Sequence, residues 1–292
     1  MSETQTIRAL LAKTRAWFEK KGIESARLDA ELLLAHALGE TRLKLYMDLD
    51  RPLASDEVDR YRALVARRGN KEPVAYLVGE REFYGHAITV RAGVLVPRPE
   101  TEHLVEEALA RLPEESGGTL IDVCTGSGCV AIAIAIARPN LRTIAIDIDD
   151  AALAIARENV ERHGLADRVV VEKRDLLAGL AERDVVGVVA NPPYVTAIAY
   201  DGLMPDVRDH EPRRALVGDD DDGLGHHRRI LAAARGHLVP SGFVAMEIGA
   251  DQEHAARALG IDGLAFDAIV KDLDGRPRVA VFTRVHDDGR DR

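Results

Sequence analysis

Apolar residues recur at helical spacing in the first part of the chain. Leucines gather between positions 28 and 34, and Tyr61, Leu64 and Val65 form a second apolar group further on. Such spacing places apolar side chains on one face of an α-helix. No strand-like run interrupts the pattern before about Gly79, so residues 1–80 are predicted to form a small helical bundle.

A short β-hairpin is expected in the linker that follows, residues 81–98. The apolar runs 88–90 and 94–96 lie on either side of Gly93, and prolines end the pattern by Pro99. Two short apolar runs around a turn residue are typical of paired antiparallel strands. The hairpin is therefore predicted to join two bodies.

Strands and helices alternate beyond Pro99. Strands are expected at residues 120–123, 143–148, 169–172, 185–190, 243–248 and 279–284, and amphipathic helices at 102–112 and 151–163. This alternation favours a mostly parallel sheet with helices on both faces, an α/β fold. Residues 130–137 alternate alanine and isoleucine as a strand would, but they follow a glycine-rich turn and are rich in the best helix former, so a buried helix is predicted. This α/β domain would span residues 99–285, and residues 286–292 are expected to be a disordered tail.

Composition and charge narrow the function classes. The chain of 292 residues is 46% hydrophobic and 30% charged, as soluble globular proteins are. Through Gly85 it carries 15 basic and 14 acidic side chains, and the remainder carries 24 and 35. Duplex DNA would be repelled by the acidic part unless a local basic groove compensated, so direct nucleic-acid binding is not expected.

Two further classes are disfavoured by what the sequence contains. The only cysteines, Cys124 and Cys129, lack the spacing of a zinc site or a disulfide framework, so no metal is expected. No apolar run approaches the roughly 18 residues of a membrane span, and the N-terminus lacks a signal-peptide pattern. A cytoplasmic location without a membrane partner is the expectation.

A glycine-rich loop is the first candidate site. Residues 122–128, D-V-C-T-G-S-G, lie between a predicted strand and a helix, where α/β sheets bind ligands. Asp147 ends the next strand, 19 residues after Gly128, where a carboxylate can accept hydrogen bonds from ribose hydroxyls. A nucleoside-containing cofactor is implied. The loop also fits G-x-G-x-x-A through Ala131, so a dinucleotide stays open at this point, as does a tight turn without a ligand.

The second candidate site is Asn191-Pro192-Pro193-Tyr194, which directly follows a continuous apolar strand. Prolines lack an N–H group, so this turn offers acceptors to a ligand that donates, such as an NH2 group. The Asn191 side-chain oxygen and the Pro192 carbonyl would accept its two hydrogens, and the Tyr194 ring would stack on the flat group that bears the nitrogen. The alternative is an ordinary turn.

These acceptors suit alkylation of a planar nitrogen. The lone pair of an amide nitrogen is delocalised into its carbonyl, which makes it a poor nucleophile. Fixed acceptors on both hydrogens would raise the electron density on nitrogen and aim it at an electrophilic methyl group. Catalysis would come from orientation and electrostatics, without a covalent enzyme intermediate.

Nearly the whole chain resembles the HemK/PrmC family, the peptide chain release factor N5-glutamine methyltransferases. The segments that carry the resemblance, besides the two motifs, are residues 26–31, 72–79, 82–85, 96–102, 211–212, 215–216 and 222–224. DNA adenine methyltransferases share only the Asn-Pro-Pro-Tyr turn and the glycines. The flanking segments therefore decide in favour of a protein substrate.

The resemblance implies a fold, a cofactor and a substrate. The fold would be a class I Rossmann-like methyltransferase domain with a mostly parallel seven-stranded sheet, preceded by a substrate-recognition domain at 1–80. The cofactor would be S-adenosylmethionine, and the substrate would be the glutamine of the Gly-Gly-Gln loop in class I release factors, with an effect on translation termination.

The resemblance also implies roles for particular residues. Asn191, Pro192 and Tyr194 would be catalytic, and these three with Pro193 would bind the glutamine. The cofactor-binding residues would be Asp122, Cys124, Thr125, Gly126, Ser127, Gly128, Asp147, Asp175, Leu176 and Asn191. Leu176 stands where the family often has an aromatic residue near the adenine. Arg98 and Glu100 are candidates for bracing the entrance of the pocket.

One departure from the family concerns the glycine-rich loop. Cys124 occupies the first glycine position of D-x-G-x-G-x-G. If φ at this residue is negative, cysteine in place of glycine costs little conformational free energy, whereas a positive φ would cost around 1 kcal/mol. We expect Cys124 to be a tolerated, passive residue.

Alternatives remain at the level of sequence. A glutamine methyltransferase of a large-subunit ribosomal protein would carry nearly the same motifs. A DNA adenine methyltransferase would need a basic channel and base flipping. A dinucleotide-dependent oxidoreductase would leave residues 191–194 unexplained, and a noncatalytic binding module on the same fold is a further class.

Overall fold

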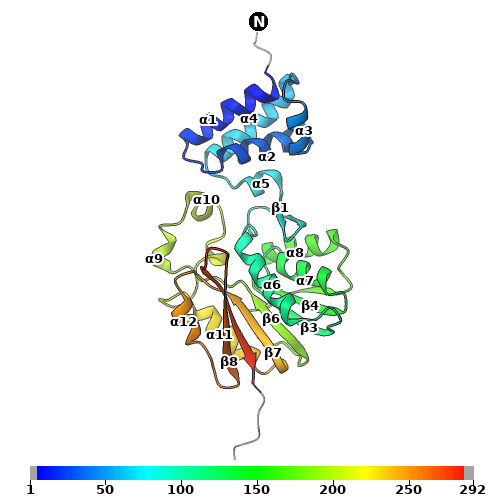
Figure 1. Cartoon of the computed structure of the whole chain (residues 1–292), viewed down its shortest axis with the longest axis vertical. Coiled ribbons are helices and arrows are strands. Elements are labelled where there is room, and N and C mark those ends of the chain that lie inside the picture. Colours follow the sequence, from blue (N-terminus) through cyan, green and yellow to red (C-terminus); the bar gives the residue numbers. More distant parts are fainter. Residues whose placement is uncertain (1–4, 286–292) are drawn as a thin grey trace, which may run out of the picture. The chain divides into compact units, whose positions relative to one another are not determined.

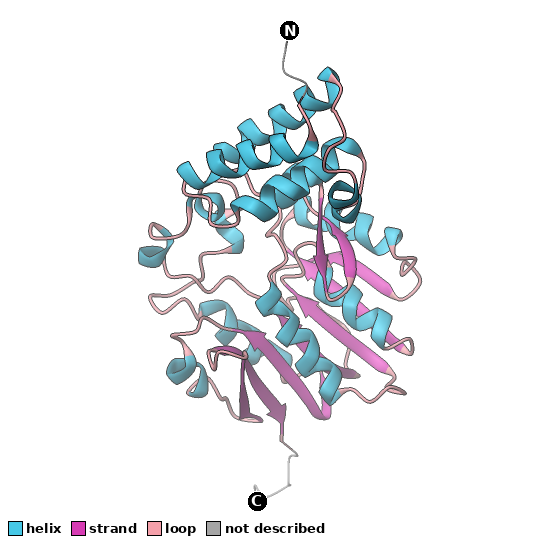
Figure 2. Cartoon of the chain, turned by 45° about the horizontal axis from the view of Figure 1, so that its top comes forward, coloured by secondary structure: helices cyan, strands magenta, loops and turns pink. Residues whose placement is uncertain are grey.

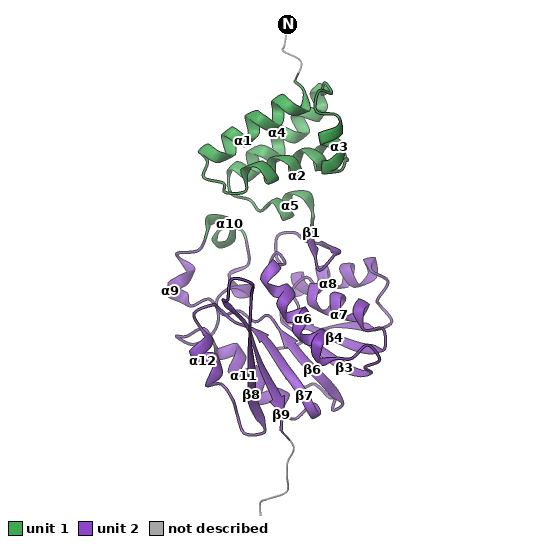
Figure 3. Ribbon diagram, viewed as in Figure 1, with its two compact units in different colours: residues 1–80, 204–210 green, residues 81–203, 211–292 purple. Residues whose placement is uncertain are grey.

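The chain forms two compact units in a computed structural model that describes residues 5–285. One unit contains the described residues up to Glu80 together with Met204–His210, and the other contains Arg81–Leu203 and continues from Glu211. Figure 3 shows the two units in different colours. The predicted tail at 286–292 lies outside the described residues.

The first unit is helical, as its apolar spacing predicts. Its helices are α1 (Ile7–Lys20), α2 (Ala26–Leu38), α3 (Arg42–Met47), α4 (Ser55–Gly69), α5 (Val74–Val78) and the short α10 (Pro205–Arg208) (Figure 1). Helix α2 packs against α1 and α4. Tyr61 of α4 is fully buried, and its hydroxyl donates to the Ala30 carbonyl of α2 at 3.1 Å, which satisfies the polar end of this large apolar side chain.

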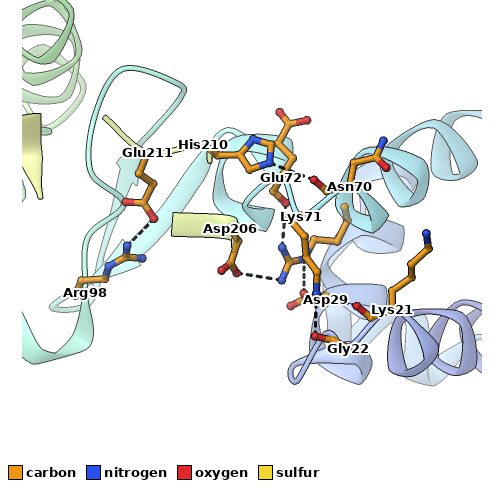
Figure 4. A network of polar contacts seen from close by, with 11 residues as sticks. Lys21, Gly22, Asp29, Asn70, Lys71, Glu72, Arg98, Asp206, His210 and Glu211 are labelled. Atoms are coloured by element: carbon orange, nitrogen blue, oxygen red, sulfur yellow. Dashed lines mark hydrogen bonds and ion pairs between the residues drawn. The ribbon is translucent and has the colours of Figure 1, made fainter. Parts of the chain in front are cut away.

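A buried arginine organises the polar contacts of this unit. Arg68 of α4 donates to the Asp29 carboxylate at 2.7 Å and to the Glu72 carbonyl at 3.2 Å, and both charged side chains of the Arg68–Asp29 pair are less than one-tenth exposed. A longer contact of 3.5 Å reaches Asp206, which therefore belongs to this unit by its contacts (Figure 4). A buried charge is tolerated only when it is paired in this way.

The hairpin is present, but its strands are not the predicted ones. Strand β1 (Glu80–Phe83) pairs with β2 (His86–Thr89), whereas residues 94–96 form no strand. Tyr84 and Gly85 between the strands have φ values of 50° and 76°, the left-handed values that two-residue hairpin turns require. The turn therefore lies one run earlier than the apolar pattern indicated.

The second unit is built on a seven-stranded sheet, in agreement with the predicted fold class. Its strands are β3 (Gly118–Val123), β4 (Leu141–Asp147), β5 (Val169–Lys173), β6 (Val185–Ala190), β7 (Leu238–Glu247), β8 (Leu264–Lys271) and β9 (Pro277–Arg284). Their order is β5-β4-β3-β6-β7-β9-β8. The neighbours from β5 to β7 pair in parallel, and β9 pairs antiparallel with both β7 and β8.

Helices cover this sheet (Figure 2). Helices α6 (Glu102–Arg111), α7 (Cys129–Ala137) and α8 (Asp150–Arg162) contact one another in series, and α7 and α8 pack on β4 and β5. Helix α11 (Gly225–Ala234) packs on β7, and α12 (Glu253–Arg257) packs on β8 and β9. The remaining elements are η1 (Pro99–Thr101), α9 (Ala197–Tyr200) and η2 (Arg213–Ala215).

The predicted buried helix is confirmed. Residues 129–135 of α7 are all buried, and Gly128, with φ of 82°, begins the helix. Strand β8 was not anticipated from the apolar pattern, because several of its side chains are partly or fully exposed at the edge of the sheet. Within residues 5–285, no helix has both the length and the apolar character needed to cross a membrane.

Candidate methyl-transfer site

The register of the parallel strands brings the two predicted motifs to one edge of the sheet. Val123 pairs with Ile146 of β4 and with Ala190 of β6, and Ala190 pairs with Met246 of β7. The residues that follow these four positions, Cys124, Asp147, Asn191 and Glu247, therefore leave the sheet side by side. This is the carboxyl edge, where open α/β sheets bind ligands.

The Asp122 carboxylate fixes the glycine-rich loop through two hydrogen bonds. This carboxylate is buried and accepts from the Thr125 hydroxyl at 2.6 Å and from the Ala131 backbone N–H at 3.2 Å, so it ties the loop to the first turn of α7. Burial raises the pKa of Asp122 to about 7. Asp122 thus has a structural role in the loop, which the sequence pattern did not suggest.

Asp147 connects the loop to the end of β4. Its Oδ2 accepts from the Gly126 backbone N–H at 2.9 Å, and its Oδ1 accepts from the Asp149 N–H at 3.0 Å. Burial raises the pKa of this carboxyl. Each carboxylate oxygen can accept more than one hydrogen bond, so both remain able to hold vicinal hydroxyl groups.

A cavity of about 520 Å³ opens along this edge. The predicted site residues that line it are Asp122, Cys124, Thr125, Gly126, Ser127, Asp147, Asp175, Leu176, Asn191 and Pro193. Among the described residues, Gly128, Pro192 and Tyr194 are not part of the lining. The loop, Asp147 and the start of the Asn-Pro-Pro-Tyr turn therefore share one cavity large enough for a nucleoside and the end of a side chain.

The turn at residues 191–194, called the acceptor turn below, is fixed by three partners. The Asn191 Nδ2 group donates to the Thr101 hydroxyl at 3.1 Å, which leaves the Asn191 Oδ1 atom to accept from a ligand. The Tyr194 hydroxyl donates to Glu247 at 3.1 Å. Gln252 donates to the Tyr194 carbonyl, also at 3.1 Å.

A glycine permits the close packing behind this turn. Gly223 has φ of 74°, and a Cβ at this position would overlap the Tyr194 carbonyl oxygen. Only glycine combines this left-handed conformation with so close an approach. Burial raises the pKa of the Tyr194 hydroxyl, so Tyr194 stays a neutral donor to Glu247.

Charged side chains lie at the rim of the cavity. Arg98 donates to Glu211 at 2.5 Å, and Glu211 also accepts from the Val96 N–H at 3.1 Å, so this pair joins the segment before η1 to the segment before η2 (Figure 4). Asp175 is half exposed and accepts from Arg229 at 2.7 Å. Glu100 lies 3.8 Å from Arg278 and does not line the cavity.

Cys124 adopts a backbone conformation that favours glycine. Its φ is 61°, in the left-handed region, where a Cβ costs about 1 kcal/mol. Leu176 has a similar φ of 51°. Burial raises the pKa of the Cys124 thiol, so the side chain is a neutral thiol and a poor nucleophile.

We expect Cys124→Gly to be more stable than Cys124→Ala by about 1 kcal/mol, because only glycine removes the Cβ from a left-handed residue. Both variants remove the sulfur, so the pair isolates the backbone effect. Urea denaturation measures the difference. In calorimetry with S-adenosylhomocysteine, both variants should bind within tenfold of the wild type. A more than tenfold gain in affinity for Cys124→Gly would show that Cys124 obstructs the cofactor.

Sequence reasoning missed three residues that organise the site. Thr101 and Glu247 hold the acceptor turn, and Asn159 of α8 donates to the Ser127 carbonyl at 2.9 Å and accepts from the Thr89 N–H at 2.8 Å. Glu247 carried a usable signal, because it is a charged residue inside an apolar strand. The role of Asn159 depends on contacts with distant segments, and the residues next to it in the sequence do not indicate that role.

These features fit a nucleoside-bearing methyl donor. The left-handed loop and Asp147 suit a ribose, and the buried Leu176 side chain offers an apolar surface for a base. Beside them, an acceptor turn faces the same cavity. The sheet and the site together define a Rossmann-fold methyltransferase that depends on S-adenosylmethionine.

Comparisons with known proteins identify the branch of this class. The family description "PrmC N-terminal domain" matches residues 9–79, and "Methyltransferase small domain" matches residues 103–204. A release factor glutamine methyltransferase of Rhodopirellula baltica is 42% identical over 281 residues, which cover 94% of this chain and 95% of the relative. Another, from Geobacter sulfurreducens, is 41% identical over 250 residues and covers 86% of each chain. The chain belongs to the release factor glutamine methyltransferase family.

A solved structure of low sequence identity supports the fold alone. A methyltransferase from Pyrococcus furiosus superposes with a TM-score of 0.52 at 19% identity, covering 70% of this chain and 91% of that one. The predicted fold class, cofactor and family are thus confirmed. The roles assigned to individual site residues stay predictions.

Proposed function

We propose that this enzyme transfers a methyl group from S-adenosylmethionine to the side-chain amide nitrogen of the glutamine in the Gly-Gly-Gln loop of class I release factors. The observation that carries the proposal is the acceptor turn at the cavity of the glycine-rich loop, with the Asn191 Nδ2 group engaged by Thr101 and Oδ1 left for the substrate. Family relatives with the same activity in their names support the choice of substrate.

The acceptor turn would act by orientation. S-adenosylmethionine supplies an electrophilic methyl group on a positively charged sulfur. The Asn191 Oδ1 atom and the Pro192 carbonyl would accept the two amide hydrogens, so that nitrogen gains electron density and faces the methyl carbon. As the new N–C bond forms and the C–S bond breaks, the nitrogen loses one proton to solvent. Tyr194, anchored by Glu247, would support the planar amide from one side.

We further propose that residues 1–80 recognise the body of the release factor and that the reaction takes place in the cytoplasm, where translation termination occurs. The match to the PrmC N-terminal domain supports a dedicated recognition domain. Residues 1–80 carry a nearly balanced charge, 14 basic and 13 acidic side chains, which suits a protein surface better than a nucleic acid.

Mass mapping of the methylated residue tests the proposal. The enzyme is incubated with S-adenosylmethionine labelled in its methyl group and with a purified, unmodified release factor, and the product is digested and sequenced by mass spectrometry. We expect one label on the glutamine of the Gly-Gly-Gln loop and none on a control release factor in which this glutamine is replaced by asparagine. A label on a ribosomal protein or on DNA, with the release factor left unlabelled, would contradict the proposed substrate.

A further inference from the structure

Arg98 brings a positive charge to the cavity beside the acceptor turn. It lines the cavity, and its side chain is 31% exposed. Within residues 5–285 the guanidinium makes a single hydrogen bond, from Nη2 to the Glu211 carboxylate at 2.5 Å (Figure 4). A guanidinium presents several N–H donors in a planar fork, so the donors on Nε and Nη1 remain for a ligand in the cavity.

A buried carboxylate fixes the orientation of this guanidinium. The Glu211 side chain is 1% exposed, and it also accepts from the Val96 backbone N–H at 3.1 Å. A buried charge is costly unless it is paired, so Glu211 opposes any movement of Arg98 away from it. The Arg98 side chain is therefore held in one orientation before a ligand binds, and little conformational entropy is lost on binding.

The contacts of Arg98 place it at one particular end of the cavity. Its carbonyl accepts from the Thr101 N–H at 3.1 Å, and the Thr101 hydroxyl accepts from Asn191, which follows β6. The predicted nucleoside contacts, Asp147 and Leu176, come from the ends of β4 and β5. Strands β4 and β5 lie on one side of β3 in the sheet, and β6 lies on the other. Arg98 therefore lies at the acceptor-turn end, away from the predicted nucleoside contacts.

The other arginines of the cavity are engaged near the ends of β4 and β5. Three of them line the cavity, and each is paired with a carboxylate at or after one of these strand ends: Arg214 with Asp149 at 2.6 Å, Arg229 with Asp175 at 2.7 Å, and Arg174 with Glu172 at 2.6 Å. Among the described residues that line the cavity, Arg98 is the remaining arginine or lysine. It is thus the cation at the acceptor-turn end.

The chemistry of S-adenosylmethionine gives this cation a partner. One substituent of the sulfur leads to the ribose and the adenine, and another leads to the amino-acid group, which carries a carboxylate. The sulfur has to face the acceptor turn for transfer, so a nucleoside over β4 and β5 leaves the amino-acid group at the other end of the cavity. A carboxylate that leaves bulk water needs a cation or several N–H donors, and a guanidinium supplies both.

We infer that Arg98 binds the carboxylate of the methionine part of S-adenosylmethionine, and that Glu211 is the positioning residue that holds the guanidinium toward the cavity. The inference rests on the proposed function in one respect, because the acceptor turn identifies the end of the cavity that holds the sulfur. Arg98 should therefore contribute to the affinity for a ligand only when that ligand carries the carboxylate.

Two ligands that differ only in this carboxylate test the inference. S-adenosylhomocysteine and its decarboxylated analogue share the adenosine, the sulfur and the amine. Calorimetry with the full chain measures the dissociation constant of each. We expect the wild type to bind S-adenosylhomocysteine about 10- to 100-fold more tightly, because a charge-assisted hydrogen bond is lost with the carboxylate. Equal affinities would overturn the inference, since no group in the cavity would then recognise the carboxylate.

Arg98→Gln should bring the preference for S-adenosylhomocysteine below threefold, with the affinity for the decarboxylated ligand within threefold of the wild type. Arg214→Gln is the matched control. It removes another arginine from the same cavity, one that is paired with Asp149, and it should keep the wild-type preference. If Arg98→Gln also kept that preference, the carboxylate would be bound by other groups, such as the N–H groups of the glycine-rich loop, and the inference would be wrong.

Two variants at Glu211 complete the test. Because Arg98→Gln removes a charged partner from a buried carboxylate, the double variant Arg98→Gln/Glu211→Gln removes both charges of the pair and should lose the preference to the same extent. Glu211→Gln alone should give a preference between those of the wild type and Arg98→Gln, and an unchanged preference would refute the positioning role of Glu211. Thermal unfolding checks the fold of each variant. No release factor enters these measurements, so a failure of the proposed substrate leaves their outcome intact.

Discussion

Asn191→Ala should reduce kcat for glutamine methylation about 1,000-fold while the dissociation constant of S-adenosylhomocysteine changes less than threefold. Alanine removes the acceptor for one amide hydrogen and also releases Thr101, to which Asn191 Nδ2 is bonded at 3.1 Å. Loss of one well-placed hydrogen-bonding group that stabilises a transition state commonly costs two to three powers of ten. Single-turnover assays with a purified release factor measure the rate, and calorimetry measures the binding.

The matched control for this prediction is Asn140→Ala. Asn140 is exposed, and its amide contacts only the Glu115 carboxylate, at 3.4 Å, among the hydrogen bonds of the described residues. The Asn140→Ala substitution removes the same kind of amide group from a residue that does not line the cavity, so kcat should be unchanged. Turnover of Asn191→Ala within threefold of the wild type would show that the acceptor turn does not bind the reacting nitrogen. Thermal unfolding of both variants separates a loss of activity from a loss of structure.

The sequence predicted which segments would gather at one edge of the sheet, because these segments lie at strand ends. Residues 122–128, Asp147 and residues 191–194 each follow an apolar run, and parallel strands bring such ends to one edge whatever the details of packing. A buried helix was predicted at residues 130–137 because this segment follows a glycine-rich turn and is rich in alanine, and the structure has it at Cys129–Ala137. These inferences used local pattern together with one general rule of topology.

What the sequence could not show depends on contacts between distant segments. Asn191 is bonded to Thr101, and Tyr194 is bonded to Glu247, although the partners in each pair lie in separate parts of the chain and no spacing rule relates them. The predicted position of the hairpin was wrong because Tyr84 adopts a left-handed conformation, with φ of 50°, which is rare for tyrosine and so was not expected from the sequence. The sign of φ at Cys124 was also left open by its residue type.

Asp147→Ala should weaken S-adenosylhomocysteine binding about 100-fold. In the structure, this carboxylate orders the loop through Gly126 at 2.9 Å, and in the proposed site it also accepts from the ribose hydroxyls. Two charge-assisted hydrogen bonds together contribute about 3 kcal/mol, or about two powers of ten in affinity. Asp262→Ala removes a carboxylate whose side chain is 98% exposed and should bind like the wild type. Unchanged affinity in Asp147→Ala would exclude this residue from the cofactor site.

The affinity for the cofactor should depend on pH through the titration of Asp147. Burial raises the pKa of Asp147, so the group takes up its proton at a higher pH than an exposed aspartate does. The protonated form loses one acceptor, and the affinity for S-adenosylhomocysteine should therefore decline as the pH falls through this raised pKa. Asp147→Asn cannot take up that proton, so its affinity should be lower at neutral pH and should lack this part of the decline. If the wild type and Asp147→Asn gave pH profiles of identical shape, the decline would arise from the titration of another group. Asp122, whose pKa is about 7, would then be the candidate in the loop.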